Sequence, residues 1–263
     1  MNETVPTLSI VFMGISCAVG FGIPVVLLLY FRIKKHADIL PFFVGCAVMI
    51  LFAFVLEAAV HRVVLSSPAG ETIRNTVWLY ALYGGIMAGL FEETGRFLAF
   101  KTVLRKKLSN DNNALMYGAG HGGLESIFIL GITMINNIIW SVLINSGNTA
   151  ALTGSLSGDI LKEVEDAIGR LLATHSYEFL LGGVERIFAV VLQISLSVLV
   201  WFAVKNRKRL WLYPAAILLH FAVDCVTAAL SGFGVSTVLI EVVVAVMAIA
   251  VALFAKRIWY QNR

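Results

Sequence analysis

The sequence predicts an all-α integral membrane protein, a polytopic bundle of about seven transmembrane helices. Composition is the first observation, because 59% of the 263 residues are hydrophobic and only 14% are charged. Soluble domains are about 45–50% apolar and about 25% charged. The second observation is a series of long apolar segments. The third is that the basic residues fall in short clusters between those segments.

Seven segments are long enough to span a bilayer, which takes about 20 mostly apolar residues. They cover residues 6–31, 39–64, 74–100, 114–143, 178–204, 210–230 and 235–255. The first is not a cleavable signal peptide, because its flank "MNET" lacks positive charge and its apolar run is too long. With no internal repeat in view, we expect a single transmembrane domain over residues 1–263, with a core at about 74–230.

The basic clusters predict the orientation of the chain in the membrane. Most of the 20 Lys and Arg residues follow the first, third, fifth and seventh spans, in "RIKKH", "KTVLRKK", "KNRKR" and "KRIWYQNR". We therefore place the N-terminus outside and the C-terminus in the cytoplasm of a multi-pass cell-membrane protein. No aromatic-basic patch accompanies these clusters, so the net charge of +4 does not indicate a nucleic-acid partner.

The segment 144–177 is the one long loop, on the predicted extracytoplasmic side. It begins with a polar, flexible stretch and continues with apolar residues at helical spacing after a capping Asp159. We expect a short amphipathic helix on the outer surface. A connector is favoured over a lid, because long loops are only sometimes functional.

Ionisable residues inside the predicted spans are the unusual feature of this sequence. Such residues are costly in a bilayer, usually face the bundle interior and mark functional sites. A helix rises about 1.5 Å per residue. The first ionisable residues of the third, fourth and sixth spans therefore lie about 12–16 Å from the cytoplasmic ends of these spans, and others lie one turn deeper. Together they are Glu92, Glu93, His121, Glu125, His220 and Asp224. Three helices thus carry acids and imidazoles to a common depth in the cytoplasmic half of the bilayer.

The spacing of these residues assigns them possible roles. Arg96 can meet Glu92 at i,i+4 or Glu93 at i,i+3, so one carboxylate can be held while the other stays available. Two adjacent carboxylates in a dry site repel each other, which suits one of them to act as a general base. His121 and Glu125 share a helix face, as do the ends of "HFAVD", and such a carboxylate can orient an imidazole or share an ion with it.

Other polar residues in the spans have structural interpretations. Glu57 and the pair Glu185–Arg186 lie nearer the outer ends, where we expect structural hydrogen bonds. The glycines of "YGAGHGG" allow close helix approach, and they could also leave room beside His121. A single polar pair would be structural too, so functional significance depends on the coincidence of many such groups at one depth.

The motifs "EETGR", "YGAGH" and "HFAVD" resemble those of the CAAX-protease and bacteriocin-processing (CPBP, Abi-like) intramembrane peptidases. The likeness is closest to the YhfC-like branch, described as intramembrane metalloproteases of bacteria, and it covers roughly residues 75–230. Two details depart from the wider pattern. Two residues rather than three separate the Glu pair from Arg96, and Asp224 replaces a commoner Asn.

The resemblance implies a peptidase in the bacterial cytoplasmic membrane that cuts a membrane-embedded or lipid-anchored substrate. It implies that Glu92, helped by Glu93, activates the attacking water. The remaining site residues it implies are Arg96, His121, His220 and Asp224. The depth of these groups predicts that substrates approach from the cytoplasmic side.

Whether a metal takes part stays open at the level of sequence. A catalytic zinc site has three protein ligands and one open position. His121, His220 and either Glu125 or Asp224 could supply these ligands. There is no HExxH motif, however, so the spacing does not choose between a metal and a metal-free mechanism.

Two functions of other classes fit the same residues. A proton- or metal-coupled transporter also uses acid and imidazole chains, although it should show polar residues along the whole path and often an inverted repeat. A non-enzymatic scaffold or immunity protein would use the same groups to hold helices together, and it should lose stability when Glu92 is replaced.

Overall fold

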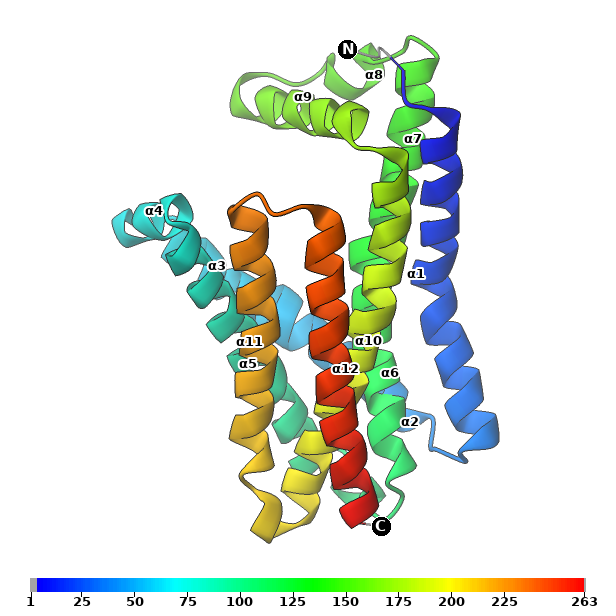
Figure 1. The fold of residues 1–263 in the computed structure, drawn as a ribbon, viewed down its shortest axis with the longest axis vertical. Coiled ribbons are helices and arrows are strands. Elements are labelled where there is room, and N and C mark those ends of the chain that lie inside the picture. The colour runs from blue at the N-terminus through cyan, green and yellow to red at the C-terminus, as the bar shows by residue number, and fades with distance from the viewer. Residues whose placement is uncertain (1–3, 263) are drawn as a thin grey trace. The chain divides into compact units, whose positions relative to one another are not determined.

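The computed structural model describes residues 4–262, and every regular element among them is helical. Figure 1 shows the arrangement. The α-helices are α1 Thr7–Lys34, α2 Leu40–Val48, α3 Ala58–Leu65, α4 Pro68–Asn75, α5 Val77–Lys101, α6 Asn112–Ser126, α7 Thr133–Asn145, α8 Ala150–Thr153, α9 Gly158–Ala173, α10 Ser176–Lys205, α11 Leu212–Gly232 and α12 Thr237–Gln261. Two π-helical segments are η1 Met49–Glu57 and η3 Ile127–Ile132, and two short 3₁₀ segments are η2 Arg105–Lys107 and η4 Arg207–Arg209.

The chain is a multi-pass membrane protein. Six continuous helical stretches of the described residues are long and apolar enough to cross a bilayer. They are Thr7–Lys34, Leu40–Leu65, Asn112–Asn145, Ser176–Lys205, Arg207–Gly232 and Thr237–Gln261, within a few residues of six predicted spans. The other predicted span coincides with α5, which is 25 residues long but is not among the six on composition, and which carries three of the buried charges.

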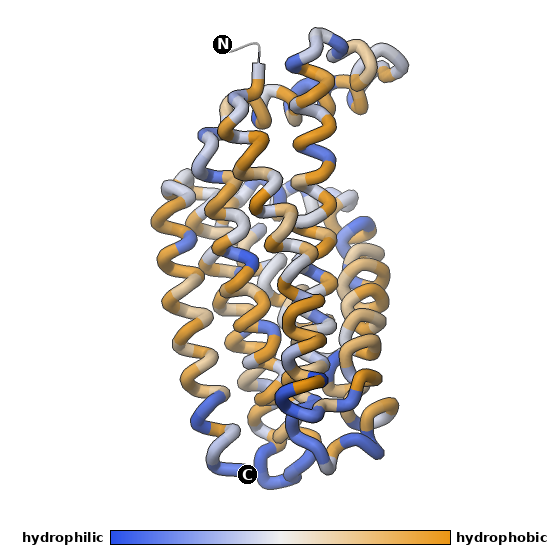
Figure 2. The backbone as a smooth tube through the Cα atoms, turned by 90° about the vertical axis from the view of Figure 1, so that its right-hand side faces the viewer, coloured by the Kyte–Doolittle hydropathy of each residue, from blue (hydrophilic) through white to orange (hydrophobic). Residues whose placement is uncertain are grey.

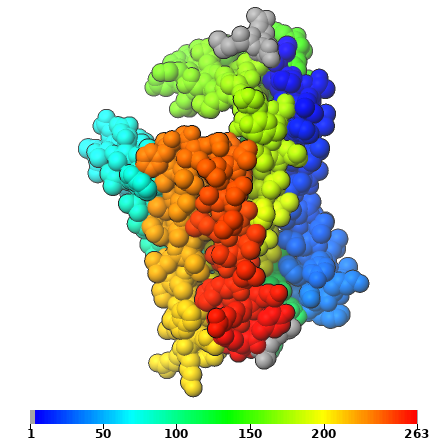
Figure 3. Space-filling model, in the orientation of Figure 1, coloured from blue at the N-terminus to red at the C-terminus, as the bar shows by residue number. Residues whose placement is uncertain are grey.

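The distribution of polar and apolar residues agrees with this assignment. Many large apolar side chains of α12 are exposed, including Val242, Val246 and Leu253, as suits a surface in contact with lipid. Figure 3 shows α12 beside α11 on one face of the molecule. Hydrophilic residues gather at the helix ends near the C-terminus in Figure 2, where the basic flanks lie. The orientation of these ends toward the cytoplasm stays a prediction.

The chain divides into two compact units. One contains the residues up to Gly22 together with Ser126–Arg186, and its apolar core includes Met13, Met134 and Phe179. The predicted amphipathic helix is confirmed as α9, with Ile168 and Leu171 buried. Asp159 is not its cap, however: the helix begins at Gly158, which has a φ of +60°, and Asp159 lies in the first turn.

The second unit contains Ile23–Glu125 and the residues from Ile187 onward. It includes η1, α5, α6, α11, α12 and most of α10. Its apolar core is centred on Phe100, Trp201 and Leu199, which are fully buried. A polar turn closes the loop before α2, where Asp38 is held by Asn113 and Lys107. All of the candidate site residues from the third, fourth and sixth predicted spans belong to this unit.

Candidate active site

Glycines bring α5 and α11 into close contact. A Cβ atom on Gly85 would lie 2.7 Å from the carbonyl oxygen of Phe221, and one on Gly89 would lie 2.8 Å from that of Ile217. Contacts this short are possible only for glycine, because small residues spaced four apart let helix backbones approach closely. Glu93 follows Gly89 by another four residues and therefore lies on the same face of α5, directed toward α11.

Glu93 is the fully buried centre of an ion pair. Arg96 donates from Nη1 to both carboxylate oxygens of Glu93 at 2.6 Å, and neither side chain is exposed. On α11, Nδ1 of His220 lies 2.9 Å from Oε1 of Glu93. The i,i+3 alternative is thus the one that forms, so Arg96 keeps a defined partner despite its shortened spacing from the Glu pair.

Glu92 faces α6 instead. Its Oε2 lies 2.9 Å from Nε2 of His121, which is fully buried. The other ring nitrogen of His121, Nδ1, is buried and has no hydrogen-bond partner among the described residues. The i,i+4 pairing predicted for His121 and Glu125 is not the contact seen at Nε2, because the carboxylate there is that of Glu92 on α5.

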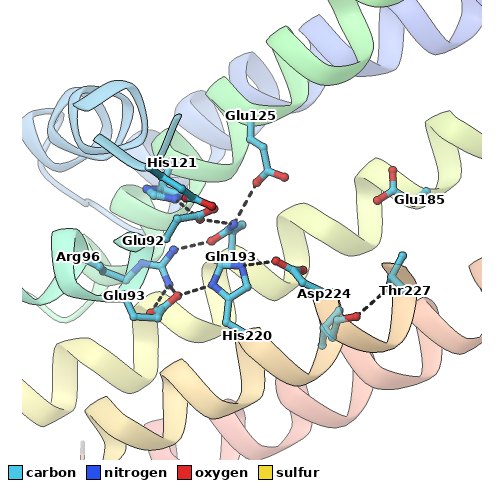
Figure 4. A network of polar contacts seen from close by, with 12 residues as sticks. Glu92, Glu93, Arg96, His121, Glu125, Glu185, Gln193, His220, Asp224 and Thr227 are labelled. Atoms are coloured by element: carbon cyan, nitrogen blue, oxygen red, sulfur yellow. Dashed lines mark hydrogen bonds and ion pairs between the residues drawn. The ribbon is translucent and has the colours of Figure 1, made fainter. Parts of the chain in front are cut away.

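A glutamine that sequence analysis missed connects these groups (Figure 4). The amide nitrogen of Gln193, on α10, donates to Oε2 of Glu92 and to Oε2 of Glu125, each at 3.0 Å. Its amide oxygen accepts a hydrogen bond from Nη2 of Arg96. One neutral side chain therefore joins both carboxylate systems to the guanidinium. In the sequence it is a single uncharged amide in a span that also contains Glu185 and Arg186.

The glycines of "YGAGHGG" have a packing role. A Cβ atom on Gly122 would lie 2.8 Å from Cβ of Gln193, and one on Gly120 would lie 2.0 Å from the carbonyl oxygen of Phe42. The space beside α6 is therefore filled by neighbouring helices, and the expectation that these glycines leave room for a ligand is not met at these two positions. Close contact at Gly122 instead brings Gln193 within reach of Glu92.

His220 has an acid in front of each ring nitrogen. Besides Glu93 at Nδ1, its Nε2 lies 3.5 Å from Oδ2 of Asp224, one turn further along α11. That distance is longer than a good hydrogen bond. Asp224 also differs in exposure, since 37% of its side chain is accessible against 3% for His220. A ligand could therefore reach the site from the side on which Asp224 lies.

The predicted residues with outer positions form separate contacts. Glu57 is buried and lies 3.2 Å from Nε2 of His61 on the same helical stretch. Glu185 is hydrogen bonded to Arg186, its neighbour in sequence. The prediction that Glu57 and Glu185 form hydrogen bonds is confirmed. Glu57 also lines the same cavity as Asp224, which its position nearer the outer end of the span did not predict.

The residues do not fit a metal ion as they are arranged. Within residues 4–262, no group of three or more His, Cys, Asp and Glu side chains is placed to hold one. Nε2 of His121 is directed at Glu92, both nitrogens of His220 face acids, and Glu125 is reached through an amide NH₂ group, which cannot bind a cation. The proposed ligand set of His121, Glu125 and His220 does not converge on one point.

The fold and the site define an integral membrane protein that encloses a buried, multi-helix centre of carboxylates and imidazoles. The chain belongs to the family described as YhfC intramembrane metalloprotease, whose pattern matches residues 19–255. It is also 41% identical over 214 residues to the "Uncharacterized membrane protein YhfC" of Bacillus subtilis (strain 168), covering 81% of each chain. No solved structure matches. The wider likeness to CPBP peptidases stays a prediction.

Proposed function

We propose that this protein hydrolyses a peptide bond of a membrane-associated substrate, with Glu92 as the general base. The observation that supports this best is the buried contact between Oε2 of Glu92 and Nε2 of His121. It fixes one carboxylate oxygen, while Oε1 accepts no hydrogen bond from a described residue. The family's description as an intramembrane protease agrees with this proposal.

The reaction needs only groups that the site contains. Glu92 takes a proton from a water molecule, and the water oxygen attacks the carbonyl carbon of the substrate. The C–N bond then breaks, and Glu92 returns the proton to the leaving nitrogen. The hydroxyl group of water ends on the acyl product and its second proton on the amine.

The rest of the network positions Glu92 and stabilises developing charge. Arg96 neutralises Glu93, so the neighbouring carboxylate Glu92 is not forced to take up a proton permanently. His220 is anchored at Nδ1 by Glu93, and its Nε2 lies 3.5 Å from Oδ2 of Asp224. In the imidazolium form His220 carries a proton on both ring nitrogens, and the Nε2–H is then suited to donate to the oxyanion of the tetrahedral intermediate, as a preorganised donor in a water-poor site.

A comparison of membrane proteins made with wild-type and Glu92→Gln protein tests this function. New N-termini are identified by mass spectrometry in cells that express each variant. We expect fragments that depend on Glu92, with cleavage reduced at least about 100-fold in Glu92→Gln, since a general base contributes 10²–10⁴ in rate. Glu165→Gln, on the exposed face of α9, is the matched control and should cleave normally.

Two outcomes would reject the proposal. Full cleavage by Glu92→Gln would remove the assigned base. Absence of any Glu92-dependent fragment, together with proton or metal flux in proteoliposomes that Glu92→Gln abolishes, would favour the transporter instead. Unchanged proteomes, no flux and a large loss of thermal stability in Glu92→Gln would favour a scaffold.

A further inference from the structure

A cavity of about 380 Å³ lies next to the proposed site and is not used by the mechanism above. Three helical stretches of the same unit form it: η1 with α3, then α5, and α11. Its lining residues are Glu57, His61, Leu65, Tyr80, Tyr83, Gly84, Gly85, Asp224 and Ala228. Its volume lies in the range of sites that bind small ligands or a substrate side chain, about 300–1,000 Å³.

The cavity reaches the site through Asp224. This carboxylate lines the cavity and is also the residue that faces Nε2 of His220. The other end lies near helix termini, since His61 is four residues before the end of α3 and Ala228 is four before the end of α11. These are the ends predicted to be extracytoplasmic. A chain that enters here would meet the reacting groups from the outer half of the membrane.

The lining carries polar and acidic groups on one wall. Oε1 of Glu57 lies 3.2 Å from Nε2 of His61, whose Nδ1 lies 2.9 Å from the hydroxyl of Tyr83. Two carboxyl groups and two tyrosines line the cavity, and among residues 4–262 no Lys or Arg does. Aromatic faces next to carboxylates favour a bound cation. The π-helical segment η1 ends at Glu57, and such segments recur at functional sites.

The adjoining network contains further carboxyl groups. Hydrogen bonds and short ion-pair contacts link four carboxyl groups there, those of Glu92, Glu93, Glu125 and Asp224, to one guanidinium and two imidazoles. A cationic group placed in the cavity would therefore complement both the lining and the site behind it.

We propose that this cavity is the substrate subsite for a Lys or Arg side chain next to the scissile bond, and that the substrate enters it from the outer half of the bilayer. This inference rests on the proposed peptidase function. It differs from the expectation of cytoplasmic access drawn from sequence. Glu57 and Asp224 are the residues that select the cation, and Gly84 and Gly85 keep the cavity open.

The charge of the cavity is tested without any peptidase activity. Ala228→Cys is made in a protein whose native thiols are removed by Cys17→Ala, Cys46→Ala and Cys225→Ala. Right-side-out vesicles are treated with a trimethylammonium-ethyl or a sulfonatoethyl methanethiosulfonate, neither of which crosses membranes. The rate of reaction with the cationic reagent is divided by the rate with the anionic reagent. This ratio should be about tenfold higher in the folded protein than in denatured protein.

Two further substitutions, each with a matched control, make this measurement specific. Glu57→Gln should lower the rate ratio severalfold, whereas Glu71→Gln, an exposed acid on α4, should not. Gly84→Leu should slow both reagents about tenfold by filling the cavity, because a Cβ at Gly84 meets nothing within 4 Å and the helix is left intact. Gly22→Leu, equally unobstructed, is its control. A ratio equal to that of denatured protein, or reaction only in inside-out vesicles, would overturn the inference.

The cleavage experiment supplies the second readout. Among Glu92-dependent fragments, Lys or Arg should be enriched at one fixed position beside the cut, and Glu57→Gln should reduce that enrichment about tenfold while cleavage at other sequences continues. Cleavage with no basic preference would reject the subsite and leave the peptidase proposal standing. If no fragments form, the peptidase proposal fails, and the rate ratio still decides whether the cavity binds cations.

Discussion

The ion pair between Arg96 and Glu93 gives the sharpest test of the site's architecture. Both side chains are fully buried, and Arg96 also donates to Gln193. Replacing Arg96 by glutamine leaves a carboxylate uncompensated in a water-poor interior. Replacing Glu93 by glutamine as well removes that charge, and the new amide oxygen can still accept a hydrogen bond from His220.

The expected loss can be estimated from burial. Breaking a buried pair by removing one partner costs about 3–5 kcal/mol, and neither charge here is screened by solvent. That is about a fifth or more of a stability of about 5–15 kcal/mol. Arg96→Gln should therefore lower the melting temperature by about 6–20 °C for a chain of this size. The double variant should recover about half of the loss, because no charge is then left unpaired.

The assay is thermal unfolding of purified protein in detergent, followed by tryptophan fluorescence, with a double-mutant cycle. A coupling energy of about 1.5 kcal/mol or more between the two positions is expected for charges in direct contact. The reasoning is refuted if Arg96→Gln is within about 1 kcal/mol of wild type, or if the two substitutions are additive. Either result would mean that the pair is hydrated or that Arg96 has another partner.

Three further predictions follow from the same contacts. The methyl group added by Gly122→Ala would lie 2.8 Å from Cβ of Gln193, so it should displace this side chain and reduce cleavage at least about tenfold. A Cβ atom at Gly14 meets nothing within 4 Å, so Gly14→Ala should cleave normally. At the loop before α2, the hydrogen bond from Asn113 holds the pKa of Asp38 below its ordinary value of 3.8. The stability that this contact adds is thus complete above pH 4 and is lost as the pH falls further, so the stability difference between wild type and Asn113→Ala should shrink in acid. Chelator treatment and metal analysis of the purified protein should show full cleavage and no stoichiometric zinc, and loss of cleavage restored by zinc would contradict the arrangement described here.

Sequence reasoning recovered the membrane class and the common location of the acids and imidazoles for a physical reason. Charges in lipid are so costly that their positions in long apolar segments indicate inward-facing, interacting groups. Helical spacing then limited Arg96 to two partners but could not choose between them. Both i,i+3 and i,i+4 pairs are within reach, and the choice depends on what lies across the interface: His220 beside Glu93, and His121 beside Glu92.

Two features were beyond that reasoning. Gln193 carries no charge, so its cost in a membrane is modest, and only the contact of α10 with Gly122 places it between the carboxylates. The cavity beside Asp224 requires Glu57 to be on the same side as α11, and this depends on the π-helical turns of η1, which no periodicity in the sequence predicts. One signal was visible and was overlooked, namely the four-residue repeat of Gly85, Gly89 and Glu93.

That repeat of Gly85, Gly89 and Glu93 explains how contact between helix backbones fixes the geometry of the site. Where glycines face a neighbouring helix, the distance between backbones is set by main-chain contact, with little freedom for adjustment. Glu93 continues the line of Gly85 and Gly89, so its carboxylate reaches His220 because the two backbones already touch, and not because the charges draw them together. Gly122 places Gln193 by the same means. A site built this way should lose its geometry more through the addition of one methyl group at Gly89 than through the isosteric change Glu93→Gln. Glu93→Gln removes the charge from the contacts with Arg96 and His220 but leaves the backbones in place, whereas the methyl group moves the helix that carries all of these contacts.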